Sequence, residues 1–197
     1  MTQSEPRRLD AVVMGASAGG VEALLALLTA LPRDFPTPIL VVLHIPRDRP
    51  SLLVSLFSRR CALAVREAED KEPLLPGTVY FAPPDYHLLV DAGPCAALSV
   101  DPLVQYSRPS IDVLFEAAAD LFRRRVLAVL LTGANSDGAR GCAAVRAAGG
   151  LVMVQDPDEA QVRYMPEAAL RLGAPDFLLR LEQMPDTLLR LARGPGA

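Results

Sequence analysis

The chain has 197 residues, a length that suits one compact domain. Its 51% of hydrophobic residues are enough to bury a core without help from disulfides or a structural metal. Its 20 basic and 23 acidic residues leave a formal net charge of -3, so the sequence lacks the basic footprint of a nucleic-acid-binding protein.

Two further features indicate a soluble protein of the cytoplasm. Three cysteines, Cys61, Cys95 and Cys142, show no C-x-x-C spacing, and their odd number argues against a disulfide framework. The apolar run at 11–14 is too short for a signal peptide, and no apolar stretch approaches the ~20 residues of a membrane span. We therefore expect neither export nor membrane insertion.

Short runs of Val, Leu and Ile without polar alternation predict strands that are buried on both faces. Helix-length amphipathic segments lie between them, several preceded by Ser, Asp or Pro. The strands are predicted at 11–14, 39–43, 126–131 and 151–154, and the helices at 20–31, 51–59, 110–123 and 138–148. This alternation predicts a doubly wound α/β fold, with a mainly parallel sheet and helices on both faces.

The middle of the chain departs from this alternation. Short strands at 77–82, 86–91 and 96–100 are separated by Pro- and Gly-containing turns, which predicts an antiparallel hairpin excursion. A strand at 177–181 and a helix at 186–193 precede a loose tail. Because neither an internal repeat nor a low-complexity linker occurs, we expect a single domain over residues 1–197.

A glycine-rich turn, Gly-Ala-Ser-Ala-Gly-Gly at 15–20, follows the first strand directly. A dinucleotide-binding turn would require Gly at Ser17, and a P-loop would require a Gly-Lys pair, whereas the only lysine is Lys71. We therefore predict no cofactor, and no metal site. A G-x-S-x-G turn remains, which would expose the Ser17 hydroxyl beside a helix N-terminus. The motif alone does not separate this nucleophile from a serine that merely caps the helix.

A nucleophilic serine needs a base, and the chain has two histidines. His44 ends the predicted strand 39–43, so in a parallel sheet it would share the carboxyl edge with Ser17. His87 lies in the hairpin region, where a partly buried, hydrogen-bonded histidine is the more typical interpretation. We therefore predict that His44 is the base.

Asp137 follows the predicted strand 126–131 and reaches the same edge, where a carboxylate could orient the histidine. Two alternatives stay open: Asp137 could cap the following helix, and Asp156 after the next strand is a competing acid. The α/β-hydrolase order of Ser, acid and His is excluded, because no histidine follows residue 87. A triad would run Ser17, His44, Asp137 on a different fold.

Six segments together resemble the catalytic domain of CheB-type chemotaxis protein-glutamate methylesterases over residues 10–182. These are the turn at 15–20, Leu-His-Ile-Pro at 43–46, Pro-Gly-Thr-Val-Tyr-Phe-Ala-Pro at 76–83, Arg-Pro-Ser-Ile-Asp-Val-Leu-Phe at 108–115, Leu-Thr-Gly at 131–133 with Asp-Gly-Ala at 137–139, and Gln-Asp at 155–156 with Met-Pro at 165–166. The resemblance implies a Ser17-His44-Asp137 triad that hydrolyses γ-glutamyl methyl esters on the cytoplasmic helices of methyl-accepting chemoreceptors. For some members of the family, the same resemblance implies a second reaction in which receptor glutamines are deamidated.

The resemblance also implies an oxyanion hole of backbone amides near Ala18 and in the loop of Ala134 and Asn135. Family members usually carry Thr at the position of Ala18 and Met at that of Ala134. Arg108 is a candidate contact to an acidic receptor surface, although an exposed arginine on a solvated face is the commoner interpretation.

Ten residues precede the first predicted strand, too few for the receiver domain of well-known family members. We therefore expect a stand-alone esterase, or one that pairs with a separate receiver or kinase protein of a phosphorelay. The alternative function is a regulatory binding module of a chemosensory complex with weakened chemistry.

Overall fold

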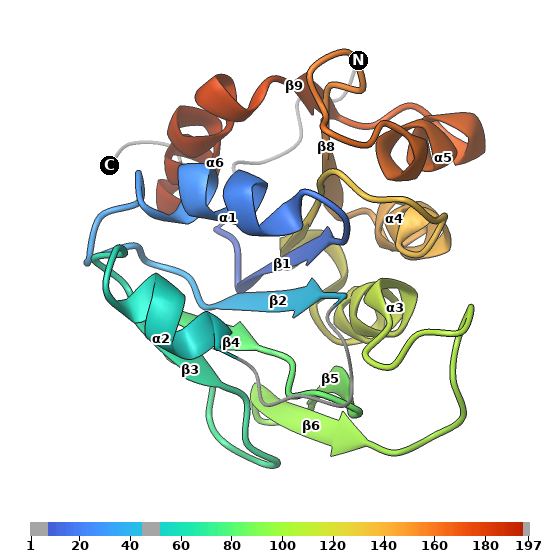
Figure 1. Cartoon of the computed structure of the whole chain (residues 1–197). Helices are drawn as coiled ribbons and strands as arrows, with labels where there is room; N and C mark the ends of the chain where they lie inside the picture. Colours follow the sequence, from blue (N-terminus) through green and yellow to red (C-terminus); the bar gives the residue numbers. More distant parts are fainter. Residues whose placement is uncertain (1–7, 45–51, 195–197) are drawn as a thin grey trace.

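The computed structural model describes residues 8–44 and 52–194. A seven-stranded sheet in the order β3-β4-β2-β1-β7-β8-β9 is parallel at every pairing, and β5 and β6 form a separate antiparallel pair (Figure 1). The strands are β1 (Ala11–Ala16), β2 (Ile39–Leu43), β3 (Ala64–Glu67), β4 (Thr78–Phe81), β5 (His87–Asp91), β6 (Cys95–Ser99), β7 (Val126–Leu130), β8 (Leu151–Gln155) and β9 (Phe177–Leu179). The predicted fold class is confirmed.

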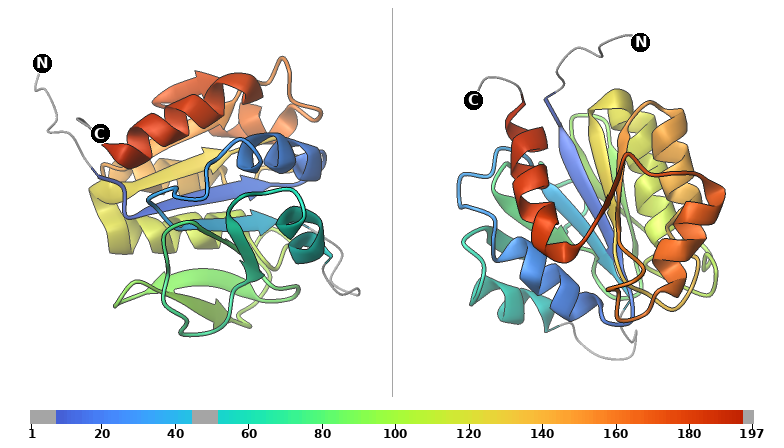
Figure 2. Two further views of the ribbon diagram at one scale, coloured as in Figure 1. Left: turned by 90° about the vertical axis from the view of Figure 1, so that its left-hand side faces the viewer. Right: turned by 90° about the horizontal axis from the view of Figure 1, so that it is seen from above.

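Helices cover both faces of the sheet (Figure 2). They are α1 (Gly20–Leu28), α2 (Leu53–Ser58), α3 (Ile111–Phe122), α4 (Ala139–Ala147), α5 (Tyr164–Leu172) and α6 (Met184–Arg193). Because successive strand residues point to opposite faces, β1 contributes Val12 to the core under α1, α2 and α6, and Val13 to the core under α3, α4 and α5. The described helices include none long and apolar enough to cross a membrane.

One prediction about the middle of the chain was wrong. The segment 77–82 is not part of the hairpin excursion: it forms β4, which pairs in parallel between β2 and β3. All four β4 residues are buried, as expected for a strand inside a sheet rather than in an exposed hairpin. The excursion consists of β5 and β6 alone.

Two elements were not predicted. The edge strand β3 is short and partly exposed, so it lacks the continuous apolar run of the central strands. Helix α5 carries Pro166 in its first turn, a position at which a helix tolerates proline. Ile45, Pro46 and the predicted start of a helix at residue 51 lie outside the described residues.

The strand order brings three loops to one edge of the sheet. β1 pairs with β2 on one side and with β7 on the other, both in parallel. The carboxyl ends of these three strands therefore meet, at the switch point where open α/β sheets carry their sites. Ser17, His44 and Asp137 all follow these ends.

Candidate active site

Backbone hydrogen bonds hold the three predicted residues at the same edge. The His44 N–H donates to the Ala16 carbonyl at 3.1 Å, and the Ser17 N–H donates to the Thr132 carbonyl at 3.0 Å. The end of β2 and the loop after β7 thus flank the turn that carries Ser17. Asp137 lies five residues beyond Thr132 in that loop.

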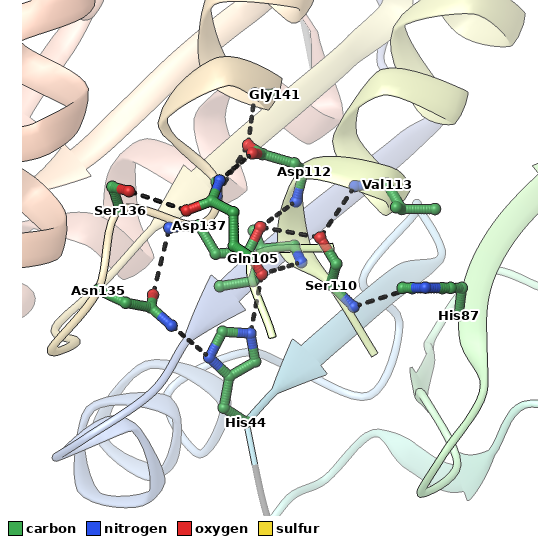
Figure 3. Close-up of polar contacts among 12 residues, drawn as sticks. His44, His87, Gln105, Ser110, Asp112, Val113, Asn135, Ser136, Asp137 and Gly141 are labelled. Atoms are coloured by element: carbon green, nitrogen blue, oxygen red, sulfur yellow. Dashed lines mark hydrogen bonds and ion pairs between the residues drawn. The ribbon is translucent and has the colours of Figure 1, made fainter. Parts of the chain in front are cut away.

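His44 and Asp137 are joined directly (Figure 3). The distance between His44 Nε2 and Asp137 Oδ2 is 2.8 Å, and the histidine side chain is 14% exposed while the carboxylate is fully buried. The competing acid, Asp156, instead accepts from the Asp158 N–H in its own turn, and no contact between Asp156 and His44 occurs among the described residues. The structure therefore pairs His44 with Asp137.

The N-terminus of α3 surrounds the Asp137 carboxylate with donors. Asp137 Oδ1 accepts from the Ser110 hydroxyl at 2.8 Å and from the Asp112 N–H at 2.9 Å, while Oδ2 also accepts from the Ile111 N–H at 2.7 Å. A helix N-terminus favours a negative charge through its unpaired amides and its dipole. Asp137 is thus bound as an anion by a helix 26 residues earlier in the chain.

Asp137 does not cap its own helix. The residue before α4 is Gly138, and no side chain caps that helix. The interpretation of Asp137 as an N-cap is therefore wrong, because its two oxygens are occupied by α3 and His44.

The surroundings of Asp137 also keep it ionised. Burial alone would raise the pKa of Asp137, but the hydrogen bond from His44, the amides of Asp112 and Ile111 and the charge of His44 together lower this pKa below its ordinary value. An ionised Asp137 can only accept hydrogen bonds, so the proton between the two groups belongs on His44 Nε2. Nδ1 is left with the lone pair of a base.

Asn135 approaches that basic nitrogen. Its Nδ2 lies 3.4 Å from His44 Nδ1, and its Oδ1 accepts from the Asp137 N–H at 3.2 Å (Figure 3). The first contact is long for a hydrogen bond and correspondingly weak. A stronger donor could therefore displace the Asn135 amide from Nδ1.

Ser17 is not a helix cap. The capping position of α1 is Gly19, with φ 77° and no side-chain hydrogen bond, and the Ser17 carbonyl accepts from the Gly20 N–H at 2.8 Å. The alternative interpretation of Ser17 is therefore wrong. The half-buried Ser17 directly follows β1, which pairs with the strand that ends before His44, but no hydrogen bond joins the Ser17 hydroxyl to the His44 ring within the described residues. The transfer of a proton between them stays a prediction.

Small residues let the loop after β7 lie against the serine turn. A Cβ on Gly133 would stand 2.5 Å from Met165 Cε and 3.0 Å from Ser17 Cβ, so a larger residue would push these segments apart. The hydroxyl of buried Thr132 donates to the Ala18 carbonyl at 2.9 Å. Thr132 thus tethers the residue after Ser17, a role that the sequence analysis missed.

Backbone amides at this edge are available to an anion. Ala18 and Ala134 are exposed, and in the described part of the chain their N–H groups donate no hydrogen bond to another residue. The N–H of Asn135 is likewise unengaged there. Because alanine side chains carry no donor, only the backbone N–H groups of Ala18 and Ala134 could bind an oxyanion at these positions, as expected from the resemblance.

The sequence analysis also missed Asp112, a fully buried carboxylate behind the site. Its Oδ1 accepts from the N–H groups of Gly138 and Gly141 at 2.8 Å each, and its Oδ2 accepts from Gln105 Nε2 at 2.9 Å. Burial raises the pKa of Asp112, the Gly141 and Gly138 amides oppose this, and the nearby Asp137 charge adds to the rise. Asp112 therefore holds the start of α4, directly after Asp137.

His87 is hydrogen-bonded, as predicted, but it is fully rather than partly buried. It is 1% exposed, its Nε2 lies 3.1 Å from the Pro102 carbonyl, and its Nδ1 accepts from the Ser110 N–H at 3.2 Å. Because Ser110 in turn donates to Asp137, His87 connects the β5–β6 pair to the acid of the site.

Arg108 has internal partners rather than a solvated face. Its Nε and Nη2 both donate to Asp85 Oδ1, at 3.1 and 2.9 Å, and its Nη1 donates to the carbonyls of Val100 and Asp101. Its side chain is only 18% exposed. The interpretation as an exposed arginine is wrong, and these contacts give no support to a role in binding an acidic receptor surface.

These observations define a class: a doubly wound α/β domain with a buried carboxylate–imidazole pair beside a serine turn, at the carboxyl edge of its sheet. No group of three or more His, Cys, Asp or Glu residues in the described ranges is arranged to hold a metal ion. The family model for the CheB methylesterase matches residues 12–188. The chain belongs to this family of carboxylic ester hydrolases, which confirms the predicted resemblance.

Individual relatives agree with this assignment. The crystal structure of the Thermotoga maritima CheB methylesterase catalytic domain superposes with a TM-score of 0.86 at 35% identity, and the match covers 92% of this chain and 97% of that chain. A protein of Leptospira interrogans is 41% identical over 182 residues, which are 92% of this chain and 94% of that protein. Protein-glutamate methylesterase/protein-glutamine glutaminase 2 of Anaeromyxobacter dehalogenans is 42% identical over 94% of this chain but only 54% of its own length.

Proposed function

We propose that the chain hydrolyses γ-glutamyl methyl esters on chemoreceptors, with Ser17 as nucleophile, His44 as base and Asp137 as orienting acid. The observation that carries the proposal is the 2.8 Å contact between His44 and the ionised, buried Asp137, on the loops that flank Ser17. The family membership supports the ester as the reacting group.

The first step forms an acyl-enzyme. Ser17 Oγ attacks the ester carbonyl carbon while its proton passes to His44 Nδ1, and Asp137 stabilises the resulting imidazolium. The amides of Ala18 and Ala134 receive the developing oxyanion. The imidazolium then returns its proton to the departing methoxide, which leaves as methanol.

Water completes the reaction. His44 takes a proton from a water molecule while the water oxygen attacks the carbonyl carbon of the Ser17 ester. The imidazolium then returns a proton to Ser17 Oγ as the bond to the acyl group breaks and the glutamate carboxylate is released. The same acyl-enzyme would form from a glutamine side chain with loss of ammonia. That second activity is supported by the printed name of the Anaeromyxobacter relative, a protein-glutamine glutaminase.

Two further proposals concern where and with whom the enzyme works. The three free cysteines, Cys61, Cys95 and Cys142, support a reducing compartment, the cytoplasm. A separate receiver or kinase protein is the proposed partner for regulation. The family membership does not favour the alternative of a binding module without chemistry.

The decisive experiment removes the nucleophile. We expect Ser17→Ala to lower kcat for methanol release from methylated receptor by about 10³- to 10⁶-fold, and to abolish labelling by a serine-directed fluorophosphonate. Ser58→Ala, which removes an exposed serine at the end of α2, is the matched control and should still be labelled. Unchanged methanol release from Ser17→Ala would overturn the proposal, and receptor binding without any labelling of the wild type would favour the binding module.

A further inference from the structure

A buried glutamine behind the serine turn has no role in the reaction described so far. Gln155 is the last residue of β8, an otherwise apolar strand, and it is only 1% exposed. Its Oε1 accepts from the Thr132 N–H at 2.9 Å, and its Nε2 donates to Glu159 Oε1 at 3.4 Å. Because the contact to Glu159 is long and correspondingly weak, the main partner of the Gln155 side chain is the backbone of Thr132.

Gln155 supplies a hydrogen-bond acceptor at the point where β7 and β8 separate. The pairing of these two strands ends before Thr132. The preceding N–H, that of Leu131, donates to the Gly15 carbonyl on β1 at 2.9 Å. The Thr132 N–H would be a buried donor without a partner if Gln155 did not accept from it. The glutamine therefore fixes the backbone of Thr132.

Thr132 in turn holds two consecutive residues of the serine turn. Its carbonyl accepts from the Ser17 N–H at 3.0 Å, and its hydroxyl donates to the Ala18 carbonyl at 2.9 Å. The same hydroxyl oxygen accepts from the Val162 N–H at 2.9 Å, whereas the Val162 carbonyl, at 3.3 Å, is the more distant acceptor for its proton. The peptide group between Ser17 and Ala18 is thus held from both sides by one residue.

That peptide group carries the Ala18 N–H, which donates no hydrogen bond within the described residues. Its carbonyl, which belongs to Ser17, accepts from the Gly20 N–H at 2.8 Å. In a planar trans peptide the N–H points away from the carbonyl, so this bond and the two bonds from Thr132 together fix the direction of the Ala18 N–H. An oxyanion donor is effective because it is oriented before the charge develops.

We propose that Gln155 is a positioning residue for the reaction, and that it acts through Thr132 on the Ala18 amide. This inference rests on the proposed function, in which that amide receives the oxyanion. Gln155 and Thr132 are each 1% exposed, so neither contacts a bound receptor. Their loss should therefore change the placement of the amide and leave the affinity for the receptor intact. A misplacement of about 1 Å can lower a rate by about 10²-fold.

The first experiment removes the Thr132 hydroxyl and keeps the shape of the side chain. We expect Thr132→Val to lower kcat for methanol release from methylated receptor by about 10²-fold, with KM within about two-fold of the wild type. Labelling of Ser17 by a fluorophosphonate should slow by a similar factor, because attack at phosphorus also places negative charge on an oxygen. Thr132→Ser restores the hydroxyl and should keep both rates within about three-fold of the wild type.

Thr37→Val is the matched control for the loss of a buried hydroxyl. Thr37 is also 1% exposed, but its hydroxyl has no hydrogen-bond partner within the described residues, so this variant should keep both rates. The pH profile of kcat/KM should keep its midpoint in Thr132→Val, because the contact between His44 and Asp137 is left in place. A shifted midpoint, or a loss that Thr132→Ser does not restore, would mark a general structural role and contradict the positioning role.

A double variant tests whether Gln155 acts through Thr132. Gln155→Met removes the acceptor at a similar side-chain length, and should lower kcat by about ten-fold, less than deletion of an oxyanion donor. Residues of one network are not additive, so Gln155→Met combined with Thr132→Val should lose no more than Thr132→Val alone, about 10²-fold. A loss of about 10³-fold, the product of the two, would contradict action through Thr132. If Gln155→Met does not fold, an unchanged kcat in Thr132→Val would by itself overturn the inference.

The rate of labelling separates this inference from the proposed function. A wild type that releases no methanol, but whose labelling slows in Thr132→Val and recovers in Thr132→Ser, would refute the receptor esterase and support the positioning role. Methanol release that depends on Ser17 but is unchanged, together with labelling, in Thr132→Val would refute the positioning role alone. A wild type that is never labelled would refute both.

Discussion

The two sides of the site are held very differently. On the acid side, the buried Asp137 accepts four hydrogen bonds, three from the start of α3 and one from His44. On the nucleophile side, the described contacts of Ser17 are those of its backbone, and the residue is half-buried. The fold therefore organises the carboxylate and the imidazole in advance, whereas no described hydrogen bond fixes the serine hydroxyl.

The largest effect is expected from removing the charge of Asp137. Asp137→Asn should lower kcat for methanol release by about 10⁴-fold. The amide would donate towards His44 Nε2, so the imidazole proton would move to Nδ1, the nitrogen that must accept from Ser17. Methanol release measures the loss, and circular dichroism checks the fold. Asp156→Asn serves as the control and should stay within about three-fold; an active Asp137→Asn would contradict the assigned acid.

The second prediction concerns Asp112, the buried carboxylate that holds the start of α4 behind Asp137. Asp112→Ala leaves the buried N–H groups of Gly138 and Gly141 without an acceptor, and should lower the free energy of unfolding by about 2–4 kcal/mol. Asp112→Asn should cost less, about 1 kcal/mol, because its oxygen still accepts and the repulsion from Asp137 disappears. Urea denaturation measures both. Asp120→Ala, which removes an exposed carboxylate on the same helix, is the control; equal losses for Ala and Asn would contradict the role of the two amides.

Replacing Ser110 should lower the free energy of unfolding by a smaller amount, and this loss should depend on pH. Ser110→Ala removes a donor to Asp137 and the cap of α3, for a loss of about 1–2 kcal/mol in the free energy of unfolding at pH 7. Because the folded pKa of Asp137 is lowered, its contribution is present above the unfolded pKa and is lost as pH falls through the folded value. The loss caused by Ser110→Ala should therefore stay constant from pH 7 down to the ordinary Asp pKa of about 3.9 and shrink as the pH falls below it, as followed by urea denaturation. A loss that stays constant below this pH as well would mean that Ser110 only caps the helix.

Asn135 should give the smallest effect. Its side chain meets His44 Nδ1 through a long 3.4 Å contact, and an alanine keeps the backbone N–H. We expect Asn135→Ala to keep kcat for methanol release within about five-fold of the wild type. A loss of 10²-fold or more, the usual effect of deleting an oxyanion donor, would instead assign the side-chain amide to the oxyanion.

Much of this architecture could be read from local pattern. The apolar runs at 11–14, 39–43, 126–131 and 151–154 correspond to β1, β2, β7 and β8, because strands buried on both faces carry no polar residue. Parallel pairing then brings their carboxyl ends together. Ser17, His44 and Asp137 could be singled out for this reason.

The parts that escaped prediction depend on contacts between distant segments. β4 looked like a hairpin strand because of the turns around it, and only its burial between β2 and β3 distinguishes it. The cap proposed for Asp137 was displaced by bonds to α3 and His44, whereas α1 begins later than expected, with Gly19 rather than Ser17 at its capping position. Ser110 and Asp112 precede Asp137 by more than 20 residues, with no local signal that connects them to it.

The amino-acid sequence by itself determined the alternation of strands and helices and the residue types that end each strand, since both follow from the polarity of neighbouring residues. Tertiary structure alone decided which carboxylate meets His44 and which nitrogen of the imidazole remains basic. These outcomes depend on hydrogen bonds and burial between segments that only the folded sheet brings within reach of one another.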